Sequence, residues 1–498
     1  MKELQILTES PYFVNTDNFC YNLVDIYPNM QRTLIQDTID QVGNAVLLKG
    51  WVAVRRDHGK LIFLDLRDRT GLIQLVVNPK VSEQAHASAN DLRNEFVIEV
   101  EGKINPRGEK QLNPDLETGK IELEVTRLQI LSRAKALPFE VNEDTKKVNE
   151  EARMKYRYLD LRSERMAKNM RLRYKAAALV REYLNKEEFV EIETPMLTKT
   201  SPEGARDFLV PSRMQPGKFY ALPQAPQQYK QMLMIAGFER YFQMARVMRD
   251  EDLRGDRQLE HTQIDLEMSF VKERDVLDLV EGLMIYVAES CGKKVWKKPF
   301  PVFTHEEAIK QFGADKFDLR GKDKDPDIMA FAWVVDFPLF EWDEDEKKFT
   351  FAHNPFSAPK TEHVEKLMAN EDLGNLRAQQ YDLVCNGFEL ASGGVRISDP
   401  AVQRKVFEIM GLSPEVAEER FGHLVNAYEY GAPPHAGMAP GFDRLVMLLA
   451  NEENIREVIA FPVNSSGQTS VMDAPSAATD KQLKELHIKV DLPKEKKK

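Results

Sequence analysis

The chain has 498 residues, too many for one ordinary hydrophobic core, so we expect two or three domains. Hydrophobic residues make up 42% and charged residues 30% of the sequence, which is typical of a soluble globular protein. A formal net charge of −11 excludes a protein that coats nucleic acid non-specifically, so any nucleic-acid binding must use local basic patches.

Two further features predict a cytoplasmic protein with no membrane partner. No apolar run approaches the length of a membrane span, and residues 1–13 lack the charged, apolar and small-residue regions of a signal peptide. Cys20, Cys291 and Cys385 are scattered and form no CxxC pair. This spacing argues against a disulfide framework and against a structural zinc site.

The N-terminal third of the chain predicts an extension followed by a barrel. Residues 1–38 are mixed in composition and carry no motif, so we interpret them as a peripheral extension. Residues 39–135 contain short β-branched stretches separated by Gly, Asp, Asn and Pro, with one helical interruption. Five or so strands of this kind predict a small barrel, such as the oligonucleotide-binding (OB) fold.

The rest of the chain predicts a linker and a larger mixed domain. Residues 136–165 are charged and contain proline, so we interpret them as a hinge or linker. From 166 to 498, antiparallel hairpins flanked by helices predict an α+β fold rather than a doubly wound sheet. No internal repeat and no GxxxxGK[ST] loop occurs, so nucleotide binding by a P-loop is excluded.

One predicted hairpin brings two carboxylates together. Asn386-Gly387 between apolar runs is a strong signal for a two-residue turn. This turn pairs Val384 with Glu389 and makes Asp382 a diagonal neighbour of Glu389. Two such carboxylates fit Mg²⁺, which prefers oxygen ligands. The alternative is a pair of exposed acids on a solvated sheet face.

A second predicted hairpin, residues 246–270, has three arginines and five acids in its turn. Arg249 and Glu251 are expected on one face of its first strand. Arg444 begins a later amphipathic helix, where an anion can bind. Two arginines and a carboxylate pair suited to Mg²⁺ predict a bound polyphosphate, whereas the charged turn alone could be a solvated loop. Polar residues of the second strand share one face, which suggests the floor of a site: His261, Gln263, Asp265 and Glu267.

Three ordered stretches resemble the signature motifs of class II aminoacyl-tRNA synthetases. Residues 190–197 resemble motif 1, whose Pro195 lies at the dimer interface in this family, residues 246–265 resemble motif 2, and residues 440–449 resemble motif 3. Further blocks are similar to bacterial-type aspartyl-tRNA synthetases, over a region from about 45 to the C-terminus: 55–74, 155–162, 194–213, 222–231 and 430–445.

The resemblance implies a six-stranded antiparallel catalytic sheet, an anticodon-binding barrel and a homodimer. It implies that L-aspartate, ATP and Mg²⁺ react to give aspartyl-adenylate, from which tRNA(Asp) takes the aspartyl group. Arg249 would hold the α-phosphate and the reacting carboxylate, and Arg444 would be the second catalytic arginine. The implied ATP site is Arg249, Glu251, Gln258, His261, Glu389, Gly441, Phe442, Asp443 and Arg444. The implied aspartate site is Glu203, Gln227, Lys230, Arg249, His353 and Arg396, and the implied metal ligands are Asp382 and Glu389.

Three departures from the family pattern stand out. Bacterial members usually carry a large domain between motifs 2 and 3, whereas residues 313–333 cross that point almost directly. His261 stands where class II enzymes normally stack a Phe on adenine. Asn354 follows His353 where the bacterial family usually has two histidines, and it offers a hydrogen bond without a charge.

The barrel predicts the mode of anticodon binding. Phe63 can stack on a base, and Gln74 can read a base edge. His58 can be an exposed turn residue, or it can donate and accept hydrogen bonds and so tolerate both C and U. Because relaxed enzymes of the family tend to carry His at this turn, tRNA(Asn) is a second expected partner. The basic residues of the same turn are Arg55, Arg56 and Lys60.

Three other functions remain as alternatives. A lysyl enzyme would need an acidic pocket, and an asparaginyl enzyme would not need the cation pair Lys230 and Arg396. An inactive paralogue that only binds tRNA would not need the intact catalytic residues.

Overall fold

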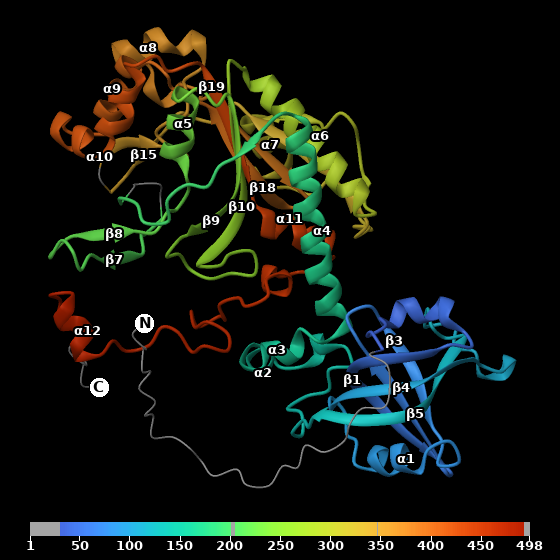
Figure 1. Cartoon of the computed structure of the whole chain (residues 1–498). Coiled ribbons are helices and arrows are strands. Elements are labelled where there is room, and N and C mark those ends of the chain that lie inside the picture. The colour runs from blue at the N-terminus through green and yellow to red at the C-terminus, as the bar shows by residue number, and fades with distance from the viewer. Residues whose placement is uncertain (1–29, 201–204, 346, 493–498) are drawn as a thin grey trace, which may run out of the picture. The chain divides into compact units, whose positions relative to one another are not determined.

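The computed structural model describes residues 30–200, 205–345 and 347–492, and the chain divides into two compact units, 1–138 and 139–498 (Figure 1). In the described ranges, every helix is too short or too polar to span a membrane. Most of the predicted extension lies outside these ranges, as do Cys20 and Glu203.

The first unit is a closed five-stranded barrel, as predicted, with the strand order β1-β2-β3-β5-β4. Side chains alternate between the core and the outer surface, so that Leu64 is fully buried and its neighbour Phe63 is half-exposed. At Gly50 an added Cβ would lie 2.3 Å from the carbonyl oxygen of Arg67, so only glycine permits this approach of two strands. The elements are η1 (Ile35–Gln41), β1 (Ala45–His58), β2 (Leu61–Arg67), β3 (Leu72–Val77), α1 (Glu83–Asn90), β4 (Val97–Pro106), η2 (Glu109–Gln111) and β5 (Ile121–Ser132).

The barrel begins before residue 39. The side chain of Ile35 is buried in the barrel core, and its backbone N–H donates to Asp68 Oδ2 at 3.0 Å. The last residues of the predicted extension are therefore part of the barrel.

The segment interpreted as a linker packs mostly within the second unit. It contains η3 (Thr145–Lys147), α2 (Glu150–Lys155) and α3 (Arg157–Asp160). The guanidinium of Arg157 is fully buried and donates to the carbonyl oxygens of Ile459 and Ala460, each at 2.9 Å. These bonds fix the segment from 139 onward to the C-terminal part of the same unit.

The second unit is built on an eight-stranded sheet with the order β12-β14-β17-β18-β19-β10-β9-β6. The six central strands are antiparallel, which confirms the expected catalytic sheet, and a short parallel strand extends it at each edge. The strands are β6 (Val190–Glu191), β9 (Arg240–Met248), β10 (Glu260–Ser269), β12 (Val302–Thr304), β14 (Phe331–Val335), β17 (Gln380–Cys385), β18 (Phe388–Val395) and β19 (His435–Pro440).

Three helices share the main hydrophobic core with this sheet: α4 (Glu164–Lys186), α6 (Glu273–Ser290) and α11 (Phe442–Leu449). Leu283 of α6 and Trp333 of β14 are both fully buried in it. Burial of a side chain such as Leu283 contributes about 1.5–3 kcal/mol, so this layer stabilises the sheet. Figure 1 shows α4 and α6 running side by side.

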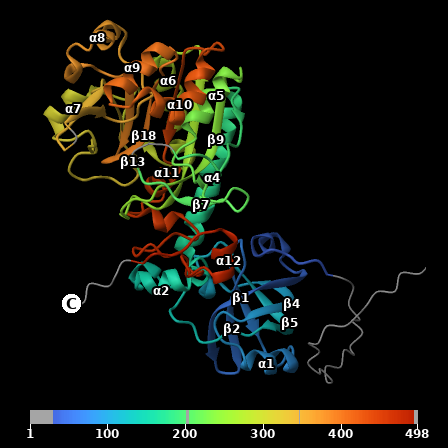
Figure 2. The same ribbon diagram turned by 90° about the vertical axis from the view of Figure 1, so that its left-hand side faces the viewer.

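A second apolar cluster lies among a group of helices, where α10 packs against both α5 and α9 (Figure 2). These helices are α5 (Gln227–Ile235), α8 (Val364–Ala369), α9 (Pro400–Ile409) and α10 (Pro414–Tyr428). The remaining elements are β7 (Leu209–Pro211), β8 (Phe219–Ala221), β11 (Lys294–Val295), α7 (His305–Phe312), β13 (Ile328–Met329), β15 (Phe340–Asp343), β16 (Lys348–Phe351), η4 (Thr361–His363), η5 (Leu373–Asn375), η6 (Ile455–Val458) and α12 (Asp480–Glu485).

Candidate active site

A cavity of about 330 Å³ lies in the second unit, over β10 and β18 and beside the N-terminus of α11. Most of the residues predicted to bind ATP and aspartate line it together: Gln227, Lys230, Arg249, Glu251, Gln258, His261, His353, Glu389, Arg396, Gly441, Asp443 and Arg444. Of the other predicted residues, Asp382 and Phe442 do not line it, and Glu203 lies outside the described residues.

The charged turn joins β9 to β10 beside the cavity. The strand pairing ends where Met248 faces Glu260, and the Arg249 N–H then donates to Leu259 O at 2.8 Å. Arg249 and Glu251 therefore lie in the loop and not on the first strand, so that part of the prediction is wrong. The strand stops there because the loop turns away to pack on η6, where the Ile455 N–H donates to the Gly255 carbonyl at 3.0 Å.

The two predicted catalytic arginines are held differently. Arg249 donates through Nε to Gln224 O at 3.3 Å, and no carboxylate within the described ranges pairs with it. Arg444 donates to Glu389 O at 2.8 Å and to Asp256 Oδ2 at 3.1 Å. Among the described residues, Arg249 thus brings an uncompensated positive charge to the cavity, whereas Arg444 also ties the charged turn to β18.

The start of α11 divides its side chains between the cavity and the core. Phe442 is buried in the core, with the Arg173 guanidinium 4.8 Å from its ring centre. Its side chain faces away from the cavity, contrary to the expectation that it contacts ATP. Asp443 accepts from Arg173 and from the Thr262 N–H, so it joins α4, β10 and α11 beneath the site.

The predicted aspartate-binding cations already have buried carboxylate partners. Lys230 Nζ lies 2.9 Å from Asp265 Oδ2 and 3.2 Å from Glu267 Oε2. Arg396 Nε lies 2.9 Å from Glu267 Oε1, and Nη2 lies 3.2 Å from Oε2. Burial raises the pKa of Glu267, but Arg396 and Lys230 outweigh it and the pKa is lowered overall. The two cations and two acids form a neutral, fully buried network.

Two acceptors on β10 have no hydrogen-bond partner within the part of the chain that the structure describes. They are Gln263 Oε1 and Asp265 Oδ1, and both residues line the cavity. A buried acceptor without a donor costs about 1–3 kcal/mol, so a ligand that carries N–H groups would be stabilised here. Sequence reasoning placed both residues on this polar face but assigned them no partner.

The predicted carboxylate pair is present at the β17–β18 hairpin. Val384 pairs with Glu389, as expected, and a bulge then places Asp382 opposite Ser392. Asp382 is buried, and burial followed by the nearby Glu389 raises its pKa well above the usual value. Two carboxylates that repel each other in this way fit a divalent cation whose other ligands are phosphate oxygens. No group of three or more His, Cys, Asp or Glu ligands occurs in the described ranges.

Comparison with known proteins identifies the family. Residues 149–465 match the model of the class II tRNA synthetases (D, K and N), and residues 46–131 match the OB-fold nucleic acid binding domain. The chain belongs to the class II tRNA synthetases.

Two curated relatives of this synthetase carry aspartate in their names. It is 42% identical to the aspartate–tRNA(Asp/Asn) ligase of Rubrobacter xylanophilus, over 91% of this chain and 96% of that protein. It is 39% identical to the aspartate–tRNA ligase of Geobacillus kaustophilus, over 93% and 100%. The first alignment is 578 positions long against a chain of 498 residues, which agrees with the missing inserted domain.

Solved structures show the same fold at low sequence identity. The asparaginyl-tRNA synthetase of Pyrococcus horikoshii has a TM-score of 0.70 and 22% identity, over 87% of this chain and 98% of that one. The aspartyl-tRNA synthetase of Entamoeba histolytica has a TM-score of 0.69 and 21% identity, over 93% and 98%. Because both kinds of enzyme share the fold, the fold alone does not select the amino acid.

His261 of this synthetase is neutral at physiological pH. Burial, followed by the charges of Arg249 and Arg444, lowers its pKa to about 3. An uncharged imidazole at the cavity wall can stack on a base as a Phe would.

We therefore expect that protonation of His261 does not change the affinity for ATP between about pH 5.5 and 8. The variant His261→Phe should bind ATP at least as tightly as the wild type. The unfolded chain protonates this His near pH 6.5 and the folded chain does not. Its contribution to stability is therefore complete above about pH 6.5 and is lost as the pH falls toward about 3. Calorimetric titration with ATP and denaturant unfolding across this range measure both effects. A change in the ATP affinity of the wild type near pH 6.5 that is absent from His261→Phe would contradict a neutral His261.

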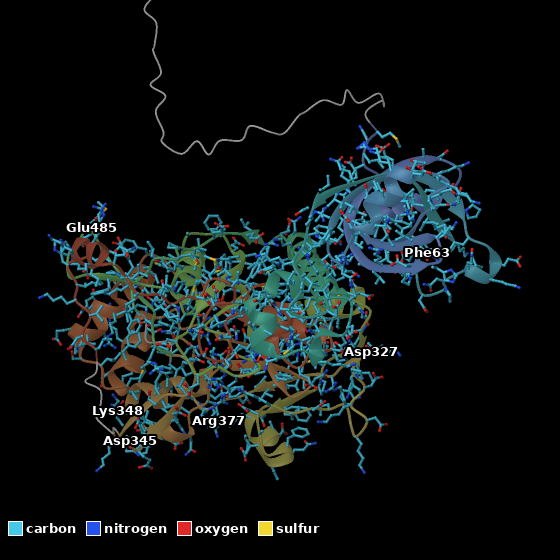
Figure 3. All side chains as sticks on the ribbon, turned by 90° about the horizontal axis from the view of Figure 1, so that it is seen from below. Phe63, Asp327, Asp345, Lys348, Arg377 and Glu485 are labelled. Atoms are coloured by element: carbon cyan, nitrogen blue, oxygen red, sulfur yellow. The ribbon has the colours of Figure 1, made fainter. Side chains whose placement is uncertain are left out.

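The predicted anticodon residues of the synthetase's OB-fold barrel differ in their exposure and in their hydrogen bonds. Phe63, labelled in Figure 3, lies on β2, opposite Arg56 on one side and Val76 on the other, and His58 is exposed at the end of β1. Gln74 Nε2 donates to Glu122 Oε2 at 2.9 Å.

The two arginines of this turn already have partners in the barrel. Arg55 donates to the carbonyl oxygens of Asn90 and Leu92, and Arg56 binds both oxygens of Asp65. The anticodon role of these residues stays a prediction, and for Arg55 the observed bonds favour a role in holding the end of α1.

Proposed function

We propose that the synthetase activates L-aspartate with ATP and then transfers the aspartyl group to tRNA(Asp). The observation that carries the proposal is a single cavity in which Lys230 and Arg396 lie with Arg249. Arg249, which has no carboxylate partner in the described ranges, and the N–H groups of Arg396 that do not bind Glu267 suit an amino acid with two carboxylates. The acceptors Gln263 Oε1 and Asp265 Oδ1, which have no partner among the described residues, suit its ammonium group. The names of the curated relatives support the same amino acid.

The reaction needs no protein nucleophile. An oxygen of the aspartate α-carboxylate attacks the α-phosphorus of ATP, and the bond to pyrophosphate breaks. A hydroxyl of the terminal adenosine of the tRNA then attacks the carbonyl carbon, AMP leaves and the hydroxyl proton is released. The protein contributes by holding the reacting groups together and by neutralising developing charge.

The cavity residues have distinct parts in this scheme. Arg249 would bridge the α-phosphate and the reacting carboxylate, because its charge is uncompensated within the described ranges. Arg444 would bind the polyphosphate from the N-terminus of α11. Asp382 and Glu389 would hold Mg²⁺, which supplies positive charge to the phosphate oxygens when bound. The adenine side would be formed by Glu251, Gln258, His261 and Gly441. Gln227 and His353 would complete the aspartate site together with Glu203.

Other amino acids suit the cavity less well. The side-chain ammonium group of lysine has only donors and would face the N–H donors of Arg396 that do not bind Glu267. Asparagine has the shape of aspartate, but its amide N–H₂ would point donors at the N–H groups of Arg396 that do not bind Glu267. An inactive paralogue would have no need of the catalytic arginines, both of which line the cavity.

We propose that the synthetase acts as a homodimer in the cytoplasm, where translation needs its product. Large apolar side chains are exposed on and after β6, around the predicted motif 1: Val190, Met196 and Leu197. Exposed apolar side chains that lie close together are typical of a subunit interface.

Aminoacylation tests the proposed function. The purified chain, given ATP and Mg²⁺, should attach labelled aspartate to a tRNA(Asp) transcript, and it should not attach asparagine or lysine to their own transcripts. Attachment of asparagine or lysine in place of aspartate would overturn the proposal.

We also propose that the synthetase charges tRNA(Asn), because His58 is exposed on the barrel and its imidazole can both donate and accept. The name of the Rubrobacter xylanophilus relative, which includes both tRNAs, supports this. The rate with tRNA(Asn) should lie within about tenfold of that with tRNA(Asp), a gap of about 1.4 kcal/mol. Parallel aminoacylation of the two transcripts measures the ratio.

The variants His58→Leu and Lys60→Ala separate the reading of a base from general turn effects. His58→Leu should raise the ratio of the rate with tRNA(Asp) to the rate with tRNA(Asn) by a further factor of about ten. Lys60→Ala should weaken the binding of both tRNAs equally. A wild-type preference for tRNA(Asp) of about a thousandfold or more would end the dual-charging proposal.

A further inference from the structure

A short connecting segment, residues 313–327 between α7 and β13, crosses the point at which the inserted domain of bacterial relatives is expected. One of its side chains, Lys316, lines the cavity. Lys316 Nζ lies 2.8 Å from Glu389 Oε2, and the two side chains remain 41% and 28% exposed. The segment therefore places a partly exposed ammonium group beside Glu389, one of the two predicted metal ligands.

The backbone at Lys316 is fixed even though its side chain can move. The next residue, Phe317, is buried, its ring lies 4.0 Å from that of Phe312, and its carbonyl oxygen accepts from the Gly387 N–H at 3.0 Å. At the far end of the segment, Asp327, labelled in Figure 3, pairs with Lys293 at 3.1 Å. Lys316 is thus held beside the turn of the β17–β18 hairpin.

Three other charged residues of the segment pair with one another. Asp318 pairs with Arg320 at 2.9 Å and with Lys324 at 3.9 Å. None of these three residues lines the cavity, and Lys322 is exposed. Within the segment, Lys316 is the cation that the fold directs at the site.

We propose that Lys316 is a polyphosphate-positioning residue that changes partner when Mg²⁺ and ATP bind. Before binding, its ammonium neutralises Glu389. With the metal at Glu389, the ammonium moves to the outer phosphate oxygens of ATP, and later to the departing pyrophosphate. This rests on the proposed function of the cavity as an ATP site.

Charge and reach support this exchange. An ammonium at Glu389 Oε2 and a divalent cation on the same carboxylate repel each other, so binding of the metal favours departure of the ammonium. A lysine has a flexible four-carbon stem and a compact charge that suits a phosphate oxygen. Arg444 contacts the backbone oxygen of the same Glu389 at 2.8 Å, so two cations flank the place where a polyphosphate would lie.

The proposal predicts opposite effects of Lys316→Met on two ligands. Mn²⁺ without nucleotide should bind about tenfold more tightly, because Glu389 no longer has a competing ammonium. ATP at saturating Mg²⁺ should bind about tenfold more weakly, because one charged contact is lost. Electron paramagnetic resonance of Mn²⁺ and calorimetric titration with ATP measure these affinities without turnover.

Lys316→Arg keeps the charge and should resemble the wild type in both measurements, and Lys322→Met is the matched control on the same segment. If Lys316→Met changes neither affinity, Lys316 is a surface residue and the proposal fails. If both affinities rise, Lys316 only competes with the metal and the proposal fails. If both affinities fall, Lys316 only supports the fold and the proposal also fails. Thermal unfolding of Lys316→Gln would reveal such a loss of stability. The Mn²⁺ measurement needs no amino acid, so its failure is distinct from a failure of aspartate activation.

Discussion

Arg249→Ala should reduce aspartate-dependent ATP–pyrophosphate exchange by about a hundredfold to a thousandfold, because a charged contact in a shielded site contributes about 3–4 kcal/mol to the transition state. Arg249 has no carboxylate partner within the described ranges, so its loss should leave the unfolding free energy almost unchanged. Arg444→Ala should lose a similar factor and also loosen the charged turn, which Arg444 binds through Asp256.

Arg246→Ala is the control on the same hairpin, since Arg246 is half-exposed and pairs with Glu260 at the surface. It should keep exchange within about twofold of the wild type, as expected for a surface ion pair. Near-wild-type exchange in Arg249→Ala would show that the uncompensated charge in the cavity has no part in the chemistry.

Arg396→Leu should abolish aspartate activation and also destabilise the fold. Arg396 binds Glu267 through two hydrogen bonds, and removal of one partner of a buried ion pair costs about 3–5 kcal/mol. Loss of activity in this variant alone would therefore not distinguish substrate binding from folding.

The double variant Arg396→Leu/Glu267→Gln separates the two effects. It removes one charge of each sign from the network, so the thermal unfolding midpoint should return most of the way to that of the wild type. Aspartate activation should stay lost, because the substrate carboxylate that Arg396 would bind still lacks this partner. Recovery of activity together with stability would mean that Arg396 acts only through the fold.

Local signals predicted the β17–β18 hairpin, because a turn dipeptide and its flanking strands determine their own register. The pairing of Val384 with Glu389 follows from Asn386-Gly387 alone. The bulge beside Val384 carries no such signal, and it moved Asp382 opposite Ser392. The alternation along β10 likewise placed the polar side chains on one face without indicating what they bind.

The partners of the buried charged residues depend on the topology of the fold, which the sequence pattern does not predict. Lys230 and Asp265 lie on different elements, and Arg396 reaches Glu267 from 129 residues away. The resemblance suggested that these cations are available to the substrate, whereas the fold pairs them with carboxylates. Lys316 was missed for the same reason, since its approach to Glu389 depends on where the segment after α7 ends.

The most direct test of the account is ATP–pyrophosphate exchange by the wild-type chain with aspartate, asparagine and lysine in turn. Exchange with aspartate should exceed exchange with asparagine by about ten-thousandfold, because the amide would leave unpaired the N–H groups of Arg396 that do not bind Glu267. Lysine should give no exchange above background. Comparable exchange with asparagine and aspartate would contradict the assignment of Lys230 and Arg396 to a substrate carboxylate, and with it the aspartate specificity.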